Sequence, residues 1–135
     1  MTRDDIQAWL DRYLDAWRTY DPQKIADLFS EDAEYRYHPW DEPERGRETI
    51  VRGWLEPAGN ASDRDAPGSY DAHYEPYAVE GDRAVAVGWS RYTRPDGSFR
   101  ALYHNVFLLR FDLEGRCRSF TEFFVEQPKR KDEPS

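Results

Sequence analysis

The chain is organised around the stretch Ala33-Glu34-Tyr35-Arg36-Tyr37-His38-Pro39-Trp40. This stretch predicts a strand that stops at a proline, with His38 as its last residue before the break. The residues before it have helical periodicity, and those after residue 69 are typical of antiparallel strands. A curved sheet with helices over its mouth encloses a pocket, so we expect His38 at the rim or on the floor of that pocket.

Three helices are expected, two before this strand and one after it. Apolar side chains recur at helical spacing across residues 3–19. Asp21 followed by Pro22 is typical of an N-cap and a first helical position, so a short second helix follows. Gly46 opens the third helix, which ends before Pro57.

The second half of the chain predicts a sheet. Four strands are expected, over 70–79, 83–93, 99–111 and 116–126. Turn residues join them over short connections, which favours consecutive antiparallel hairpins. The Gly-, Asn-, Asp- and Pro-rich segment 58–69 predicts an exposed loop that can act as a mobile lid. We therefore expect one α+β domain over 1–127, a curved antiparallel sheet with three N-terminal helices covering a pocket. A disordered, charged tail over 128–135 follows it.

Composition narrows the class of protein. The chain has 135 residues, enough for one core. Its net charge of −8 argues against nucleic acid or an anionic membrane as a partner. The single cysteine, Cys117, excludes an internal disulfide and a cysteine-based zinc site and suits a reducing compartment. No signal peptide or membrane-spanning run is evident, so we expect a cytoplasmic protein. Any enzymatic activity is expected to use no cofactor.

The last hairpin predicts which side chains share a face. If Phe111 pairs with Arg116, directly opposed residues lie on one face. The opposed pairs are then Phe107 with Phe120, Asn105 with Glu122, and Tyr103 with Phe124. A one-residue bulge would change this register. The other face is also apolar and includes Leu108, Cys117, Phe123 and Val125. Because a sheet that is apolar on both sides needs cover on both, we expect a homodimer through the outer face.

Two segments carry a family resemblance. The first is Arg12-Tyr13-Leu14-Asp15-Ala16 with Asp21-Pro22-Gln23-Lys24-Ile25-Ala26-Asp27-Leu28-Phe29-Ser30-Glu31-Asp32-Ala33, and the second is Leu109-Arg110-Phe111-Asp112 with Gly115-Arg116. With the order of predicted elements, they resemble the nuclear-transport-factor-2-like superfamily. Its SnoaL-like and ketosteroid-isomerase-like branches are the most similar. The resemblance implies a cone-shaped curved antiparallel sheet, the cystatin-like roll. Members of the superfamily include isomerases, cyclases, dehydratases, epoxide hydrolases and non-catalytic binders.

The resemblance assigns roles to three positions. Tyr13 lies where the isomerases place a tyrosine that donates a hydrogen bond to the substrate oxyanion. His38 lies where they place the catalytic aspartate before a proline. Phe107 lies where they place a second, protonated aspartate, so that donor is missing here. The Asp-Arg-Asp arrangement of the epoxide hydrolases is not evident either.

Proton-transfer chemistry follows from the residues expected in the pocket. His38 can act as a general base near neutral pH, and Tyr13 can stabilise an oxyanion. Glu122 can orient the imidazole or act as a second acid–base group, and Asn105 can anchor a polar substrate atom. Structural alternatives remain open, because a histidine before proline is often a capped residue and Tyr13 also fits a core position. Glu122 also has an alternative, an ion pair with Arg118 or Arg36.

The function expected is therefore binding of a small hydrophobic molecule in an aromatic pocket. The expected substrate-binding residues are Trp17, Tyr35, Trp54, Trp89, Tyr103, Asn105, Phe107, Phe120 and Phe124. An enzyme of this kind is an isomerase or a lyase with His38, Tyr13 and Glu122 as catalytic residues and no metal. The alternative is a non-catalytic ligand-binding or protein-interaction module of the same fold.

Overall fold

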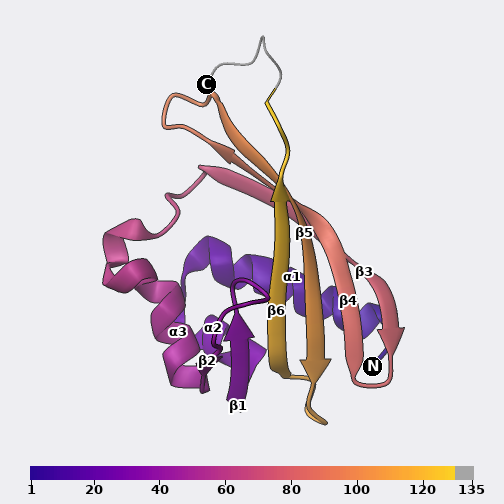
Figure 1. Ribbon diagram of the computed structural model, residues 1–135. Helices are drawn as coiled ribbons and strands as arrows, with labels where there is room; N and C mark the ends of the chain where they lie inside the picture. The colour runs from indigo at the N-terminus through magenta and orange to yellow at the C-terminus, as the bar shows by residue number, and fades with distance from the viewer. Residues whose placement is uncertain (130–135) are drawn as a thin grey trace.

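The computed structural model describes residues 1–129 as three helices and one curved, unclosed sheet (Figure 1). The helices are α1 (Arg3–Thr19), α2 (Pro22–Leu28) and α3 (Arg47–Leu55), with short 3-10 turns at Pro57–Gly59 and Ala61–Asp63. The strands are β1 (Phe29–Arg36), β2 (Glu44–Arg45), β3 (Tyr70–Glu80), β4 (Arg83–Thr93), β5 (Phe99–Phe111) and β6 (Cys117–Glu126). From residue 130 onward, the predicted tail lies outside the described residues.

The strand order is β2-β1-β6-β5-β4-β3, and the expected α+β architecture is confirmed. Strands β3 to β6 form the predicted antiparallel meander, whereas β1 joins β6 in parallel. The short strand β2 is not among the strands that the sequence predicts. Helix α1 lies across one face of the sheet, called here the inner face, and α3 lies beside β1 (Figure 1).

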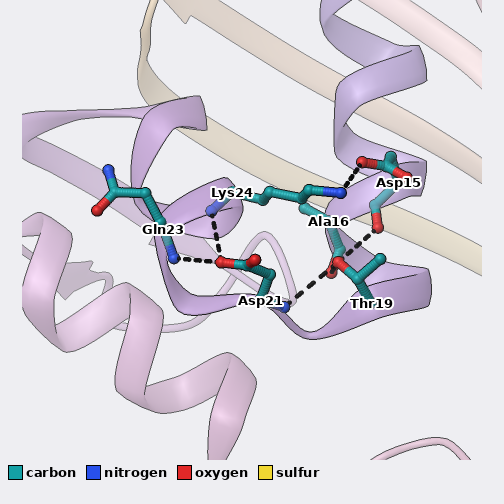
Figure 2. Close-up of polar contacts among 6 residues, drawn as sticks. All are labelled: Asp15, Ala16, Thr19, Asp21, Gln23 and Lys24. Atoms are coloured by element: carbon teal, nitrogen blue, oxygen red, sulfur yellow. Dashed lines mark hydrogen bonds and ion pairs between the residues drawn. The ribbon is translucent and has the colours of Figure 1, made fainter.

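Local hydrogen bonds fix the turn between α1 and α2, as Figure 2 shows. The Asp21 carboxylate accepts hydrogen bonds from the backbone N–H of Gln23, at 2.8 Å, and of Lys24, at 3.3 Å. It therefore caps the helix that Pro22 begins, as the sequence predicts. Lys24 Nζ lies 2.8 Å from Asp15 Oδ2 on α1, an exposed pair that contributes little to stability.

The core forms where α1 meets the inner face of the sheet. Trp9 is fully buried and packs edge-on against Phe29 and Phe111, with ring centroids 6.2 and 5.6 Å away. Its indole N–H donates a 3.0 Å hydrogen bond to the carbonyl of Leu28. One turn further along α1, Tyr13 stacks 5.7 Å from Phe120. The helical spacing in the sequence predicts which face of α1 is buried. These contacts place that face against β5 and β6.

The predicted register of the last hairpin is wrong by two residues. Phe111 pairs with Cys117 rather than Arg116, and beyond an irregularity Leu109 pairs with Phe120 and Phe107 with Glu122. The first slip comes from Gly115, whose φ of 81° closes a shorter turn than expected. The second comes from the irregularity between Arg110 and Phe111.

Each single-residue shift in register would move the side chains to the opposite face of the sheet, because side chains alternate with a period of two. The two shifts together therefore leave them on the predicted face. Asn105, Phe107, Phe120 and Glu122 therefore still share the inner face, although Asn105 and Glu122 are diagonal neighbours rather than direct partners. Cys117 lies between the two slips, so its predicted position on the outer face is wrong. It is fully buried in the core opposite Phe111.

Gly88 lies in β4, between Tyr74 of β3 and Asn105 of β5. A Cβ atom built on Gly88 would lie 1.8 Å from the backbone carbonyl oxygen of His73, where no flexible side chain can move aside. By contrast, a Cβ on Gly53 of α3 would meet only the end of the Glu44 side chain, at 2.6 Å. The sheet therefore requires glycine at position 88, and the helix does not require it at position 53.

We predict that Gly88→Ala lowers the free energy of unfolding by about 3 kcal/mol, the upper range for overpacking. Gly53→Ala should change it by less than about 1 kcal/mol, since alanine's higher helix propensity offsets the displaced carboxylate. Urea denaturation followed by circular dichroism measures both values. Equal stability of the two variants would contradict the close backbone approach at Gly88.

Candidate functional site

A cavity of about 620 Å³ lies between the helices and the inner face of the sheet. Helices α1 and α3 and all six strands contribute residues, and the segments that follow α1, β1 and α3 contribute the rest. Its lining consists of Tyr13, Trp17, Tyr20, Tyr35, Tyr37, Glu44, Gly53, Trp54, Glu56, Pro57, Gly59, Asp63, Asp65, Tyr74, Ser90, Tyr92, Asn105 and Glu122. Of the predicted site residues, Tyr13, Trp17, Tyr35, Trp54, Asn105 and Glu122 are thus brought together.

Aromatic rings are the commonest kind of side chain in the cavity wall. Tyr13 of α1 lies 5.3 Å from Trp54 of α3 and 5.9 Å from Tyr74 of β3, both edge-on. Tyr35 of β1 packs edge-on against Trp54 at 6.4 Å. Burial raises the pKa of Tyr13, Tyr35 and Tyr74 well above the usual range. These phenols therefore stay neutral and present both a ring and a hydroxyl.

A chain of polar side chains crosses the inner face of the sheet. The Ser90 hydroxyl donates to Asn105 Oδ1 at 3.1 Å, and Asn105 Nδ2 donates to Glu122 Oε2 at 2.9 Å. Burial raises the pKa of Glu122 to about 7, against the opposing effects of the Asn105 hydrogen bond and the His38 charge. Glu122 can therefore either donate or accept a proton near neutral pH.

The ion pairs considered for Glu122 do not form. Arg36 lies 3.8 Å from Glu34 and donates to the carbonyl of Asp41 at 3.2 Å. Within residues 1–129, no basic side chain, Arg118 included, lies within 4.0 Å of the Glu122 carboxylate. Its main polar contact is therefore the amide of Asn105.

A second polar region lies between β2 and α3. Glu44 Oε2 and Trp54 Nε1 are both buried and make no hydrogen bond among the described residues. Burial raises the pKa of the Glu44 carboxyl. Glu44 can approach α3 closely because Gly53 has no side chain there. Buried polar groups are usually hydrogen-bonded, so these two atoms are candidates to contact a bound molecule.

The side chain of Asp65 joins the segment 58–69, which is predicted to act as a lid, to the end of α1. Asp65 Oδ2 accepts hydrogen bonds from Trp17 Nε1 at 3.0 Å and from the Tyr20 hydroxyl at 3.4 Å. The Asp65 backbone N–H donates in turn to the Tyr20 oxygen at 3.1 Å. This clasp holds residues 57–65 at the mouth of the cavity, where several of them line it.

His38 lies outside this cavity, in the turn that follows β1. β1 ends at Arg36, two residues earlier than expected. The turn is held by Asp41, because its carboxylate accepts a hydrogen bond from the backbone N–H of His38 and lies 2.9 Å from the Nδ1 atom of the His38 ring. The ring stacks on Trp40 at 5.0 Å and borders a second cavity of about 470 Å³. Glu122 and Asn105 border both cavities. A catalytic role for His38 stays a prediction.

The other predicted substrate-binding residues do not line the main cavity. Phe107 and Phe120 are buried in the core against Tyr13. Trp89 lies beside His73 on the outer face, because its neighbour Ser90 points inward and side chains alternate along β4. Tyr103 and Phe124 contact each other at 5.6 Å near the end of the hairpin, and Phe124 packs against His38.

Several lining residues were missed by the sequence reasoning. Tyr74, Ser90 and Tyr92 lie on the inner face of β3 and β4, and counting outward from the Gly81-Asp82 turn would have indicated Ser90 and Tyr92. The irregularity between Pro76 and Ala78 hides Tyr74 from such a count. Glu44 and Asp65 belong to irregular segments, whose side-chain directions follow no period.

The part of the chain that the structure describes has neither a cluster of metal-ligating side chains nor a membrane-spanning helix. No group of three or more His, Cys, Asp or Glu side chains lies close enough together to hold a metal ion. None of the helices in residues 1–129 has the length and apolar character needed to cross a bilayer.

A curved, unclosed sheet with helices on its inner face and an aromatic cavity between them defines the nuclear-transport-factor-2-like class. The sequence model of the SnoaL-like domain matches residues 10–120, so the chain belongs to the SnoaL-like domain family. The family resemblance seen in the sequence is thereby confirmed.

Solved structures agree on the fold. The chain is similar to an NTF-2 like protein of unknown function from Burkholderia xenovorans LB400, with a TM-score of 0.67 and 15% sequence identity. The match covers 96% of this chain and 89% of that protein. No curated protein matches the sequence. At this identity the likeness concerns the fold, and the chemistry must be argued from the cavity.

We predict that acidification stabilises the protein through Glu122. The folded state raises the pKa of this carboxyl from 4.5 to about 7, so folded chains hold a proton that unfolded chains release between these values. The free energy of unfolding should therefore fall as the pH rises from 4.5 to 7, by up to about 3 kcal/mol.

Urea denaturation across this pH range, in the wild type and in Glu122→Gln, isolates the effect. The variant should lack this part of the pH dependence. Glu75→Gln on the exposed side of β3 is a matched control and should keep it. The same slope in Glu122→Gln and wild type would show that Glu122 titrates normally.

Proposed function

We propose that the main cavity binds a small, largely apolar ring compound and that Glu122 exchanges a proton with it. The observation that carries this proposal is a carboxyl group with a pKa of about 7, held by Asn105 inside an aromatic cavity of about 620 Å³. A cavity of this size fits a small molecule of a few fused rings.

The arrangement supports acid–base chemistry of the isomerase, cyclase or dehydratase kind. A protonated Glu122 can donate to a substrate oxygen, and the ionised form can remove a proton next to a carbonyl. The neutral hydroxyl of Tyr13 can hold the oxyanion that results. His38, oriented by Asp41, can assist from the neighbouring cavity, since its charge already affects the pKa of Glu122. A cytoplasmic location remains part of this proposal and suits the free thiol of Cys117.

A thermal-shift screen of steroids, aromatic polyketides, terpenoid epoxides and small ketones tests binding. A compound at a hundredfold excess over its Kd stabilises the folded state by about 2.7 kcal/mol, which raises Tm measurably. Each compound that binds is then assayed for conversion by wild type, Glu122→Gln and Glu75→Gln.

We predict that Glu122→Gln lowers kcat by about 10²- to 10⁴-fold, as expected for loss of a general acid–base group, while ligand binding persists. Glu75→Gln should match the wild type. His38→Ala tests whether His38 is required for catalysis. Full activity in this variant would leave Glu122 as the essential group. Binding without conversion of any compound favours the non-catalytic module, and an unchanged kcat in Glu122→Gln contradicts the role of Glu122.

We also propose that the outer face of the sheet forms a homodimer. Leu108, Phe123 and Val125 lie on this face and are 43%, 40% and 69% exposed. The second cavity continues the same apolar surface through Val87 and Val106. A second copy can cover this surface symmetrically, and exposed apolar patches commonly mark such interfaces.

We predict that Val125→Glu converts the dimer to a monomer, because it places a charge on the apolar surface that the second copy would cover. Leu113→Glu, in the exposed β5–β6 turn, is the control and should leave the assembly unchanged. Sedimentation-velocity centrifugation measures both. A wild-type chain that sediments as a monomer would rule out the dimer.

A further inference from the structure

We propose that the molecule bound in the main cavity carries a positively charged nitrogen, seated among tyrosine rings against the carboxylate of Glu122. A quaternary ammonium, a protonated tertiary amine or a cationic heterocycle has this chemistry. The inference rests on the proposed function, because it names the class of ring compound that the same cavity binds.

The cavity wall is rich in electron-rich rings. Eight of its lining side chains are aromatic, six tyrosines and two tryptophans. The face of each ring carries a partial negative charge that attracts cations, and cages of such rings recognise quaternary ammonium groups. One lining ring already shows this attraction, since the guanidinium of Arg64 lies 5.4 Å from the centre of Tyr20.

The charged groups in the wall have one sign. Glu44, Glu56, Asp63, Asp65 and Glu122 contribute carboxylates, and no lysine, arginine or histidine among the described residues lines the cavity. Such a wall attracts a cation and repels an anion. The acidic side chains and the rings therefore favour the same kind of ligand for independent physical reasons.

Glu122 lines the same cavity as these rings, and its charge acts on most of the tyrosines. After burial, its negative charge is a further cause that raises the pKa of Tyr13, Tyr35, Tyr37, Tyr74 and Tyr92. These five tyrosines come from α1, from β1 and the turn after it, and from β3 and β4. One carboxylate thus shares the cavity with rings that four different elements supply.

The charge of the ligand then decides whether binding stabilises or destabilises the ionised form of Glu122. A neutral ring compound displaces water from Glu122 and leaves its charge with the Asn105 amide as the main partner. A cationic nitrogen supplies the missing counter-charge in the same place, where Coulomb attraction is stronger than in water. Cations should therefore bind more tightly than neutral molecules of the same shape.

Three shape-matched probes test the inference by isothermal titration calorimetry at pH 8. They are N-methylquinolinium, 1-methylnaphthalene and 1-naphthoate, which differ mainly in charge. We expect the cation to bind about tenfold more tightly than the neutral probe or better, and the anion to bind most weakly. Glu122→Gln should lose most of the cation's advantage while still binding the neutral probe.

Glu75→Gln removes one negative charge on the exposed side of β3 and controls for the acidic surface as a whole; it should keep the cation's advantage. Equal or tighter binding of 1-methylnaphthalene overturns the inference and leaves the proposed function intact. Full retention of the cation's advantage in Glu122→Gln also overturns it. If none of the probes binds and the ring-compound screen is negative as well, the proposed ligand-binding function itself fails.

Discussion

The packing of α1 against the inner face of the sheet is the contact on which the rest of the structure depends. Trp9 joins the helix to Phe29, Phe111 and Phe120, and its indole hydrogen bond to Leu28 fixes the junction of α2 and β1. A curved open sheet has a hollow that one helix cannot fill. Trp9 fills the part nearest the start of β1, and beyond Tyr13 the hollow remains as the cavity.

The same geometry explains why a carboxylate in this cavity has unusual properties. Side chains on the inner face are either covered by α1 or line the cavity, so a polar residue there loses much of its contact with bulk water. Glu122 is partly compensated by Asn105, which Ser90 holds in turn. The hydrogen bond stabilises the ionised carboxylate only in part, so desolvation still raises the pKa of Glu122 to about 7. Burial by the fold thus produces the group that the proposed chemistry uses.

Much of this arrangement could be predicted from the sequence. The helical spacing over 3–19 identified the buried face of α1, and the alternation in the last two strands placed Asn105 and Glu122 together on the inner face. The register was wrong because Gly115 and the irregularity near Phe111 are local backbone features without a periodic signal. The sidedness was right because the two slips together amount to two residues. Glu44, Asp41 and Asp65 escaped notice because loops and very short strands carry no period that fixes where a side chain points.

The end of β1 determines which residues near the cavity can take part in proton exchange. Arg36, the last residue of β1, pairs with Thr121, so Glu122 is the first residue of β6 beyond that pairing. From there the chain turns away through His38 and Asp41, and β6 continues without its neighbour. A side chain at this step is covered from the inside by aromatic rings and is accessible from the second cavity on the side of His38. A carboxyl deeper in the sheet would be costly to ionise, and one further along β6 would be exposed to water and titrate normally. Position 122 combines removal of the carboxyl group from bulk water with access from the second cavity. The proton-exchange role is therefore better supported for Glu122 than for His38.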